Sequence, residues 1–162
     1  SMTGAADALP EGAQVVHLTG RGKDEPVRAA VEAAGLSDRW HVIDYLTTME
    51  DALAVADLVV CRSGAGTVAE MEALGLPCIY VPLPIGNGEQ RLNAADHVAA
   101  GGAQLIDDKD FTADFVRRNV FPLLGSTRLA DMAAASQSLG RAGAARALAD
   151  LAFEQVKGAG HE

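Results

Sequence analysis

The sequence predicts an α/β protein, a Rossmann-like open parallel sheet flanked by helices. Short apolar runs recur along the chain and alternate with helical patterns, which is the order of βαβ units. These runs are continuously apolar, as are strands buried on both faces of a parallel sheet. Alanine and glycine are abundant and aromatic residues make up only 4% of the chain, which favours close packing of helices on a sheet.

The expected strands are the apolar runs, and the first of them, AQVVHLT, ends at Gly20. The runs WHVID, LVVC and PCIYV follow in order, and a last short run comes directly after a pair of glycines. By residue number, the predicted strands are 13–19, 40–44, 58–61, 77–81 and 103–106.

Helical patterns fill the segments between and after these runs. Glycine ends several of them, because it tolerates the left-handed conformation that closes a helix, and Gly35, Gly75 and Gly101 stand at such ends. Thr47 or Thr48 can cap a short helix. The predicted helices are 24–34, 48–56, 66–74, 89–100, 112–124, 126–138 and 141–156.

The composition disfavours several function classes. The 162 residues are enough for one domain. The formal net charge of −9 disfavours nucleic-acid binding, which depends on basic patches. No apolar run reaches the roughly 18 residues of a membrane span, and no signal-peptide pattern is visible. The two cysteines, Cys61 and Cys78, fit a reduced cytosolic protein better than a disulfide scaffold.

The segment CRSGAGTVAE, from Cys61 to Glu70, carries the strongest local signal. A strand leads through small residues into a helix, so a ligand can approach the backbone closely. The first amides of the helix have no partner within it, and the helix dipole favours a phosphate or a sugar hydroxyl there. Ser63 or Thr67 can cap this helix instead, and a tight strand-to-helix turn without a ligand explains the spacing equally well.

Polar residues near this segment suit a sugar nucleotide. Glu70 can accept two hydrogen bonds from a ribose diol, or it can be a solvated acid near the helix start. Gln90 and Asn93 share a helix face, and amides suit sugar hydroxyls, although an ordinary polar helix start has the same residues. The backbone of Leu46 can hydrogen-bond to the edge of a flat ring of a ligand. Alternatively, Leu46 only packs its side chain against the rest of the protein.

Other chemistries find no support in the sequence. His17, His41 and His97 do not stand at metal-ligand spacing, and they fit hydrogen-bonded core residues better than ligands. The sequence has no CxxC pair, no GxSxG nucleophile turn and no phosphate loop with a Walker lysine. It also has no acidic pair that resembles a metal clamp, so we expect ligand binding without a metal or a cofactor.

Together these residues resemble one family. The stretch from Ala56 to Ala94 resembles the donor-binding half of the MurG-type glycosyltransferases (glycosyltransferase family 28). Its sequence PLPIGNGEQRLNA is similar to that of the actinobacterial members. The most specific parts are CRSGAGTVAE and GLPCIYVPLPIGNGEQRLNA, and the resemblance covers about residues 15–156.

The resemblance implies a GT-B fold, in which two Rossmann-like domains enclose the active site. The C-terminal domain of such enzymes binds UDP-N-acetylglucosamine: Glu70 matches the residue at the ribose, Leu46 the backbone that reads uracil, and Gln90 and Asn93 those at the sugar. Glu89 stands where relatives often have a second glutamine. The residues implied for the donor are Leu46, Ser63, Gly64, Ala65, Gly66, Thr67, Val68, Ala69, Glu70, Gln90 and Asn93.

The resemblance also implies how the chain is organised. The family's glycine-rich GGSxGA loop is absent from the sequence, and so is its N-terminal domain. We therefore expect residues 1–12 to be the truncated end of a helix and a linker, 13–157 the UDP-sugar domain, and 158–162 a disordered tail. The missing first βα unit would leave a sheet edge exposed, which invites pairing with another chain.

In the parent enzyme, N-acetylglucosamine would pass with inversion to undecaprenyl-diphospho-N-acetylmuramoyl-pentapeptide, converting lipid I to lipid II in peptidoglycan synthesis. The acceptor would bind the missing domain, the chain alone would hold no catalytic residue, and the enzyme would be cytoplasmic and peripheral on the inner face of the membrane. Two alternatives stay open. One is a stand-alone donor-binding subunit of a lipid-linked N-acetylglucosamine transferase, and the other is a non-enzymatic nucleotide-binding module.

Overall fold

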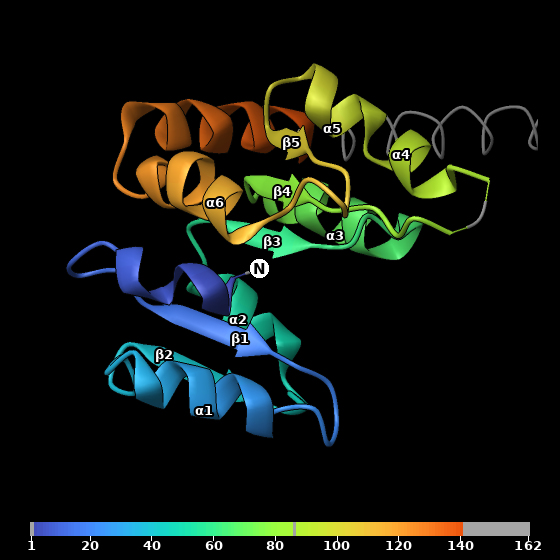
Figure 1. Cartoon of the computed structure of the whole chain (residues 1–162). Helices are drawn as coiled ribbons and strands as arrows, with labels where there is room; N and C mark the ends of the chain where they lie inside the picture. The colour runs from blue at the N-terminus through green and yellow to red at the C-terminus, as the bar shows by residue number, and fades with distance from the viewer. Residues whose placement is uncertain (1, 86, 141–162) are drawn as a thin grey trace, which may run out of the picture. The chain divides into compact units, whose positions relative to one another are not determined.

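The computed structural model describes residues 2–85 and 87–140, so the predicted helix 141–156 and the tail 158–162 lie outside the described residues. The chain divides into two compact units. The first contains residues 2–56 and 109–127, and the second contains residues 57–108 and 128–140 of the described chain. Each unit has its own parallel sheet, so the predicted α/β class is confirmed (Figure 1).

The first unit contains a two-stranded parallel sheet. β1 (Val15–Leu18) pairs with β2 (Trp40–Ile43) in the register Val15 to Trp40 and Leu18 to Ile43. α1 (Glu25–Ala33) connects them, and Gly35, with φ of 67°, closes its end as predicted. Before β1 lies a 3-10 helix (Thr3–Ala8), and α2 (Met49–Ala54) follows β2.

Only one face of this small sheet is covered within the unit. Trp40, Val42 and Val31 are buried, and the Trp40 indole Nε1–H donates to His17 Nδ1 at 3.3 Å. Val16 and Leu18 on β1 are 45% and 38% exposed. The prediction that every strand is buried on both faces is therefore wrong for β1, because successive side chains point to opposite faces and one face has no cover in its unit.

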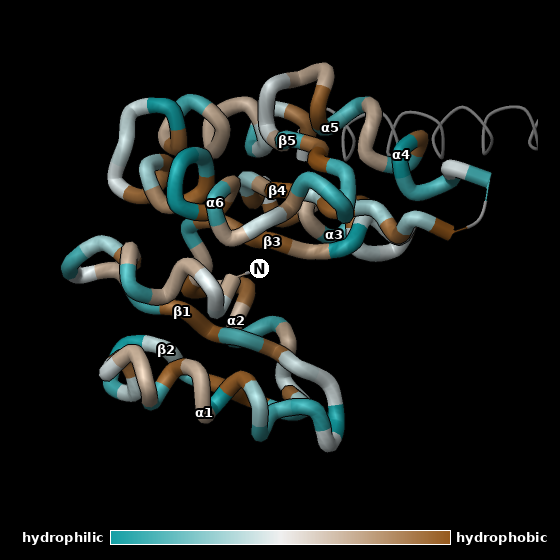
Figure 2. Tube along the Cα trace, in the orientation of Figure 1, coloured by the Kyte–Doolittle hydropathy of each residue, from teal (hydrophilic) through white to brown (hydrophobic). Residues whose placement is uncertain are grey.

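The second unit is built on the sheet β3-β4-β5, which is also parallel. β3 (Val59–Cys61) leads to α3 (Ala65–Leu74), and β4 (Cys78–Tyr80) lies in the centre with all of its residues buried. β5 (Ala103–Leu105) completes the sheet. Residues 127–140 form a further helix. Figure 2 shows β1 and β3 as hydrophobic segments of the chain.

Several predicted elements differ in detail. The expected single helix 89–100 is divided into α4 (Glu89–Asn93) and α5 (Ala95–Ala99), with the junction at Ala94. The expected helix 112–124 consists of α6 (Ala113–Phe115), a π-helical turn (Val116–Val120) and a 3-10 turn (Phe121–Leu123). Thr48 makes no side-chain cap, whereas the Thr112 hydroxyl accepts a hydrogen bond from the Phe115 amide.

The strands of the described residues lie in two parallel sheets, one in each unit, with the orders β1-β2 and β3-β4-β5. Within each sheet the strands are neighbours in the order in which they occur along the chain, as in consecutive βαβ units.

A buried hydrogen-bonded network joins the elements of the second unit. The Tyr80 hydroxyl is 2.9 Å from His97 Nδ1, and His97 Nε2 is 2.8 Å from the Ser136 hydroxyl oxygen. Ser136 donates its proton to the Gly102 carbonyl at 3.2 Å, so it accepts from His97 Nε2–H. Burial lowers the pKa of His97, so the imidazole is neutral at pH 7 and its Nδ1 accepts from the Tyr80 hydroxyl.

The network leaves no room at Gly102. A Cβ atom there would lie 2.4 Å from the Ser136 hydroxyl oxygen and 2.6 Å from a carbon of the His97 ring. The Gly102 carbonyl also accepts a hydrogen bond from the Cys78 amide at 3.2 Å. Glycine at this position therefore lets β4, β5 and the helix 127–140 meet.

The neutral His97 predicts lower stability in acid. Burial lowers the pKa of His97, so as pH falls below about 6.5 the unfolded chain takes up a proton before the folded chain does. The stabilisation is complete above that pH and is lost as pH falls through the folded pKa. We expect the melting temperature to fall between pH 7 and pH 5, measured by thermal unfolding.

The matched control is His97→Gln, which keeps a polar side chain but does not titrate in this range. Its melting temperature should start lower and change less between the two pH values. The lowered pKa of His17 and the raised pKa of Glu72 are common to both proteins and cancel in the comparison. Equal pH slopes for the two proteins would contradict the assignment.

Candidate ligand site at the start of α3

The loop between β3 and α3 presents unpaired backbone amides. Gly64 is the residue before the helix, with extended backbone angles of −64° and 149°, and the Val68 amide is the first to bond within the helix, to the Gly64 carbonyl at 2.9 Å. The amides of Ala65, Gly66 and Thr67 therefore have no acceptor within α3. With the positive end of the helix dipole, they form a place where an anion is stabilised.

Ser63 adds a buried hydroxyl without a partner. Its side chain is completely buried, and Ser63 Oγ makes no hydrogen bond with any described residue. The prediction that Ser63 or Thr67 caps the helix is wrong, because Gly64 holds the cap position and no side chain bonds to the helix start. A buried hydroxyl that lacks a partner costs folding free energy, so its presence here points to a ligand.

The glycines of the loop leave space beside the backbone. A Cβ atom at Gly66 would meet nothing within 4 Å, and one at Gly64 would only reach the Thr67 hydroxyl at 4.0 Å. Neither glycine has positive φ, so neither is required by the backbone angle. The predicted close approach of a ligand to this backbone is sterically open.

One of the two predicted amide side chains, Asn93, lies against this loop, and the other, Gln90, bonds to the segment after β4. Asn93 Nδ2 donates to the Ser63 carbonyl at 3.1 Å, and the Leu83 amide donates to Gln90 Oε1 at 2.9 Å. The structure therefore brings α4 to the loop before α3, as expected for one site. Both side chains also have a structural role that the sequence did not indicate.

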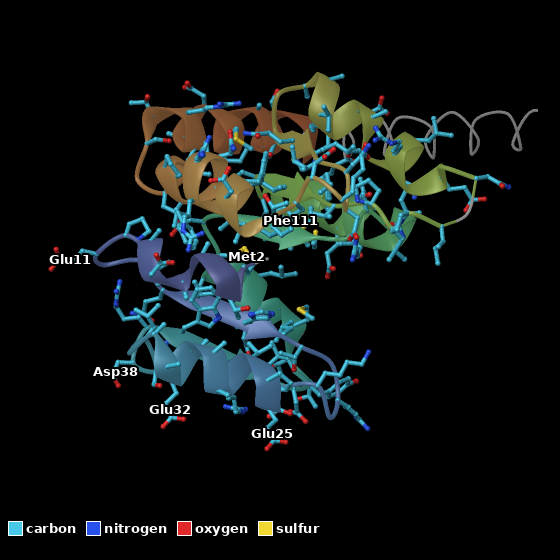
Figure 3. The ribbon with its side chains drawn as sticks, in the orientation of Figure 1. Met2, Glu11, Glu25, Glu32, Asp38 and Phe111 are labelled. Atoms are coloured by element: carbon cyan, nitrogen blue, oxygen red, sulfur yellow. The ribbon has the colours of Figure 1, made fainter. Side chains whose placement is uncertain are left out.

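The remaining predicted residues take different positions. Glu70 and Ala69 are exposed on α3, whereas Val68 is buried in the core. Leu46 is half-buried in the turn after β2, and so it belongs to the first unit. Figure 3 shows the side chains of the described residues, among them Glu25 and Glu32, which project from α1.

The sequence analysis missed a set of arginine contacts at the same end of the sheet. Arg62 pairs with Asp108 at 2.5 Å, and Arg91 pairs with the neighbouring Asp107. Arg62 and Asp108 are 46 positions apart, so no local spacing could reveal the pair. The only signal in the sequence is that charged residues directly follow two strands.

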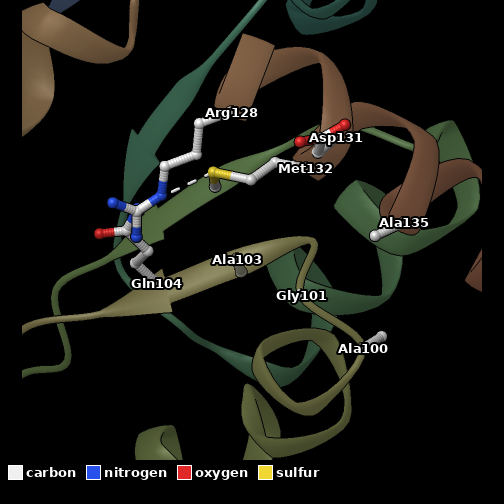
Figure 4. A pocket seen from close by; sticks show the side chains of 8 residues that line it. All are labelled: Ala100, Gly101, Ala103, Gln104, Arg128, Asp131, Met132 and Ala135. Atoms are coloured by element: carbon white, nitrogen blue, oxygen red, sulfur yellow. Dashed lines mark hydrogen bonds between the residues drawn. The ribbon is translucent and has the colours of Figure 1, made fainter. Parts of the chain in front are cut away.

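A separate hollow of about 360 Å³ lies beside β5 and contains none of the predicted ligand residues (Figure 4). Gln104 Nε2 donates to Met132 Sδ across it at 3.8 Å. The start of α3 needs no such hollow, because exposed amides can bind an anion at the surface. The hollow is lined by Ala100, Gly101, Ala103, Gln104, Arg128, Asp131, Met132 and Ala135.

The described part of the chain contains neither a metal-binding cluster nor a membrane-spanning helix. No group of three or more His, Cys, Asp and Glu side chains there could hold a metal ion. No helix within residues 2–85 and 87–140 has the length and apolar character needed to cross a membrane. Cys61 and Cys78 are free thiols.

Comparison with known proteins decides the family. The model of the glycosyltransferase family 28 C-terminal domain matches residues 2–152. The chain belongs to this family. The resemblance of its motifs to these transferases is therefore confirmed, and so is the GT-B type of fold.

Curated relatives carry the name UDP-N-acetylglucosamine–N-acetylmuramyl-(pentapeptide) pyrophosphoryl-undecaprenol N-acetylglucosamine transferase. The one from Paenarthrobacter aurescens is 44% identical over 96% of this chain and 42% of its own length. The one from Mycolicibacterium smegmatis is 55% identical over 72% of this chain and 31% of its own length. The family 28 chain thus spans about two fifths or less of these relatives.

A solved structure of MurG from Acinetobacter baumannii is similar to the chain, with a TM-score of 0.74 and 26% identity over 84% of this chain and 40% of that one. The glycosyltransferase VinC, solved with DTDP, matches with a TM-score of 0.65 and 20% identity over 88% of this chain and 34% of its own, which shows the fold alone.

The unpartnered hydroxyl of Ser63 predicts an unusual mutational result. Ser63→Ala removes a buried polar group that has no partner, so the free chain should keep its stability or gain up to about 1 kcal/mol. The matched control is Ser136→Ala, which removes a buried hydroxyl bonded to His97 and Gly102 and should cost about 1–3 kcal/mol. Denaturant unfolding of both variants measures the difference, and a large loss for Ser63→Ala would show that its hydroxyl already has a partner.

Proposed function

We propose that this chain is the donor-binding part of a transferase that moves N-acetylglucosamine from UDP-N-acetylglucosamine to undecaprenyl-diphospho-N-acetylmuramoyl-pentapeptide, with inversion at the anomeric carbon. One observation carries the proposal: the buried, unpartnered Ser63 hydroxyl stands beside the free amides at the start of α3. The relatives' printed names supply the two substrates.

The start of α3 suits the diphosphate of the donor. As the sugar leaves, UDP gathers negative charge, and amides already aimed at that place stabilise it without reorganisation. The amides of Ala65, Gly66 and Thr67 are available for this, and Ser63 can donate one further hydrogen bond. The geometry supports stabilisation of the leaving group by the chain itself.

The other predicted residues take the two ends of the donor. Glu70 would accept hydrogen bonds from the ribose hydroxyls, each worth roughly 1.5–3 kcal/mol because one partner is charged. Gln90 and Asn93 would read the hydroxyls of N-acetylglucosamine. The bond of Asn93 to the Ser63 carbonyl, and the place of Gln90 on the same helix, support this. The backbone of Leu46 would read uracil.

The acceptor and the proton transfer belong to other parts of the parent enzyme in this proposal. The lipid-linked muramyl-pentapeptide would bind a second domain, which would also supply the base that removes the proton from the acceptor hydroxyl. The enzyme would be cytoplasmic and would act while peripheral on the inner face of the membrane. The chain alone would bind donor and transfer nothing.

Donor binding is tested by a thermal-shift titration of this chain with UDP-N-acetylglucosamine, UDP, UDP-glucose and NAD. A ligand present at 100 times its Kd stabilises the fold by roughly 2.7 kcal/mol, which a melting curve resolves. We expect UDP-N-acetylglucosamine to stabilise the chain most and Glu70→Ala to lose most of that shift. The shift should persist in EDTA.

Glu32→Ala is the matched control, since Glu32 is an exposed glutamate on α1 in the first unit. It should retain the full shift. A larger shift with NAD than with any UDP compound would favour a general nucleotide-binding module, and no shift with any ligand would contradict the proposal.

We also propose that the chain pairs with a second copy through a sheet edge. β1 has β2 as its neighbour and β3 has β4, so each has a parallel edge unpaired within its own sheet, and Val16 and Leu18 expose apolar surface. Light scattering should give the mass of a dimer at high concentration, and Val16→Lys should shift it toward one chain. The mass of one chain at every concentration would contradict the pairing.

A further inference from the structure

Arg62 lies at the carboxyl-terminal end of the β3-β4-β5 sheet, where it connects the segments that follow the three strands. It lies directly after β3, and its Nη1 donates to the carbonyls of Val81 at 3.0 Å and Pro82 at 3.2 Å. The same nitrogen pairs with Asp108 Oδ1 at 2.5 Å. Val81 and Pro82 follow β4 and Asp108 follows β5, so one guanidinium meets a segment from each strand.

The contacts of α4 extend this junction to the ligand site. The backbone of Ser63, next to Arg62, accepts from Asn93, and Gln90 accepts from the Leu83 amide in the loop after β4. Arg62 therefore fixes the segment after β4, to which Gln90 on α4 bonds, relative to the loop that carries Ser63. Gln90 is proposed to read the sugar, and the Ser63 loop is proposed to bind the diphosphate.

Arg62 acts at the junction mainly through its bonds to the Val81 and Pro82 carbonyls, and less through its ion pair. The ion pair is exposed, with side-chain exposures of 48% and 39%, and such pairs contribute little to stability. Val81 and Pro82, however, are buried, and buried carbonyls need donors. A planar guanidinium holds several N–H groups in fixed directions, which an ammonium does not.

We infer that Arg62 is a positioning residue for sugar selection: it sets the distance between the residues that read N-acetylglucosamine and the loop that binds the diphosphate. This inference rests on the proposed function. The amides of α3 keep their arrangement through the helix itself, whereas Gln90 and Asn93 depend on the junction for their place. Loss of Arg62 should then weaken binding of the sugar nucleotide far more than binding of UDP.

The experiment measures the Kd of UDP-N-acetylglucosamine and of UDP by calorimetry for this chain and for Arg62→Ala. We expect the Kd of UDP-N-acetylglucosamine to rise about tenfold and that of UDP to change less than about threefold, so the preference for the sugar nucleotide is lost. The melting temperature should fall as well, because the carbonyls of Val81 and Pro82 lose a donor. The ratio of the two Kd values is therefore the deciding readout, and a purely structural role would leave that ratio unchanged.

Arg117→Ala is the matched control, because Arg117 also donates to a carbonyl, that of Gly4 at 2.7 Å, and also pairs with an exposed carboxylate, that of Asp7. It belongs to the first unit, which contains neither α3 nor α4. It should keep the ratio of the two Kd values. Arg62→Lys and Asp108→Asn serve if Arg62→Ala does not fold, and each should lose part of the preference.

The outcomes separate the inference from the proposed function. A wild-type chain that prefers UDP-N-acetylglucosamine over UDP, with an unchanged preference in the Arg62 variants, overturns the inference alone. A wild-type chain that binds neither compound overturns both. An equal loss of preference in Arg117→Ala would overturn the specific role of Arg62.

Discussion

The buried imidazole of His97 is the contact on which the second unit depends. Its two ring nitrogens bond to Tyr80 on β4 and to Ser136 on the helix 127–140. The Ser136 hydroxyl in turn donates a hydrogen bond to the carbonyl of Gly102, the residue before β5. Because Ser136 donates to a carbonyl and burial keeps the ring neutral, Nε2–H donates to Ser136 and Nδ1 accepts from Tyr80. In a buried network that is fully satisfied, a displaced member leaves a buried polar group unpaired, which is costly. The network thereby holds a central strand, an edge strand and two helices in one arrangement.

The start of α3 shows the opposite condition in the same unit. There the Ser63 hydroxyl is buried without a partner, and the amides of Ala65, Gly66 and Thr67 have no acceptor in the helix. Sequences that fold well satisfy their local rules, and the exceptions concentrate where a ligand completes the structure. A rigid sheet, held by His97, is what allows the exception to persist. The two features therefore belong together: a fully hydrogen-bonded core supports a neighbouring loop whose polar groups lack partners.

How far the sequence could predict this depends on the range of the forces involved. Apolar runs and glycines act locally, so the strands, and the end of α1 at Gly35 and of α3 at Gly75, were predictable, with left-handed angles of 67° and 68°. The break at Ala94 was not, because its neighbours are ordinary helical residues. Asn93 bonds to Ser63 and His97 to Ser136, so distant partners fix the chain on each side. The arginine junction is equally non-local. The predicted ligand roles of Glu70 and Leu46 rest on the resemblance and on the places of these residues after the strands. Both roles stay predictions.

The direction of the strands gives a second reason to place the ligand after β3. In an open α/β sheet, ligands bind outside the carboxyl ends of the strands. β3, β4 and β5 are parallel, so the segments that follow them lie at one end of their sheet. The segment after β3 is the one that leads to the free amides of α3 and holds the unpartnered Ser63 hydroxyl, and both were identified without reference to the direction of the strands. Strand direction and unpaired polar atoms therefore place the ligand at the same residues, 63–67.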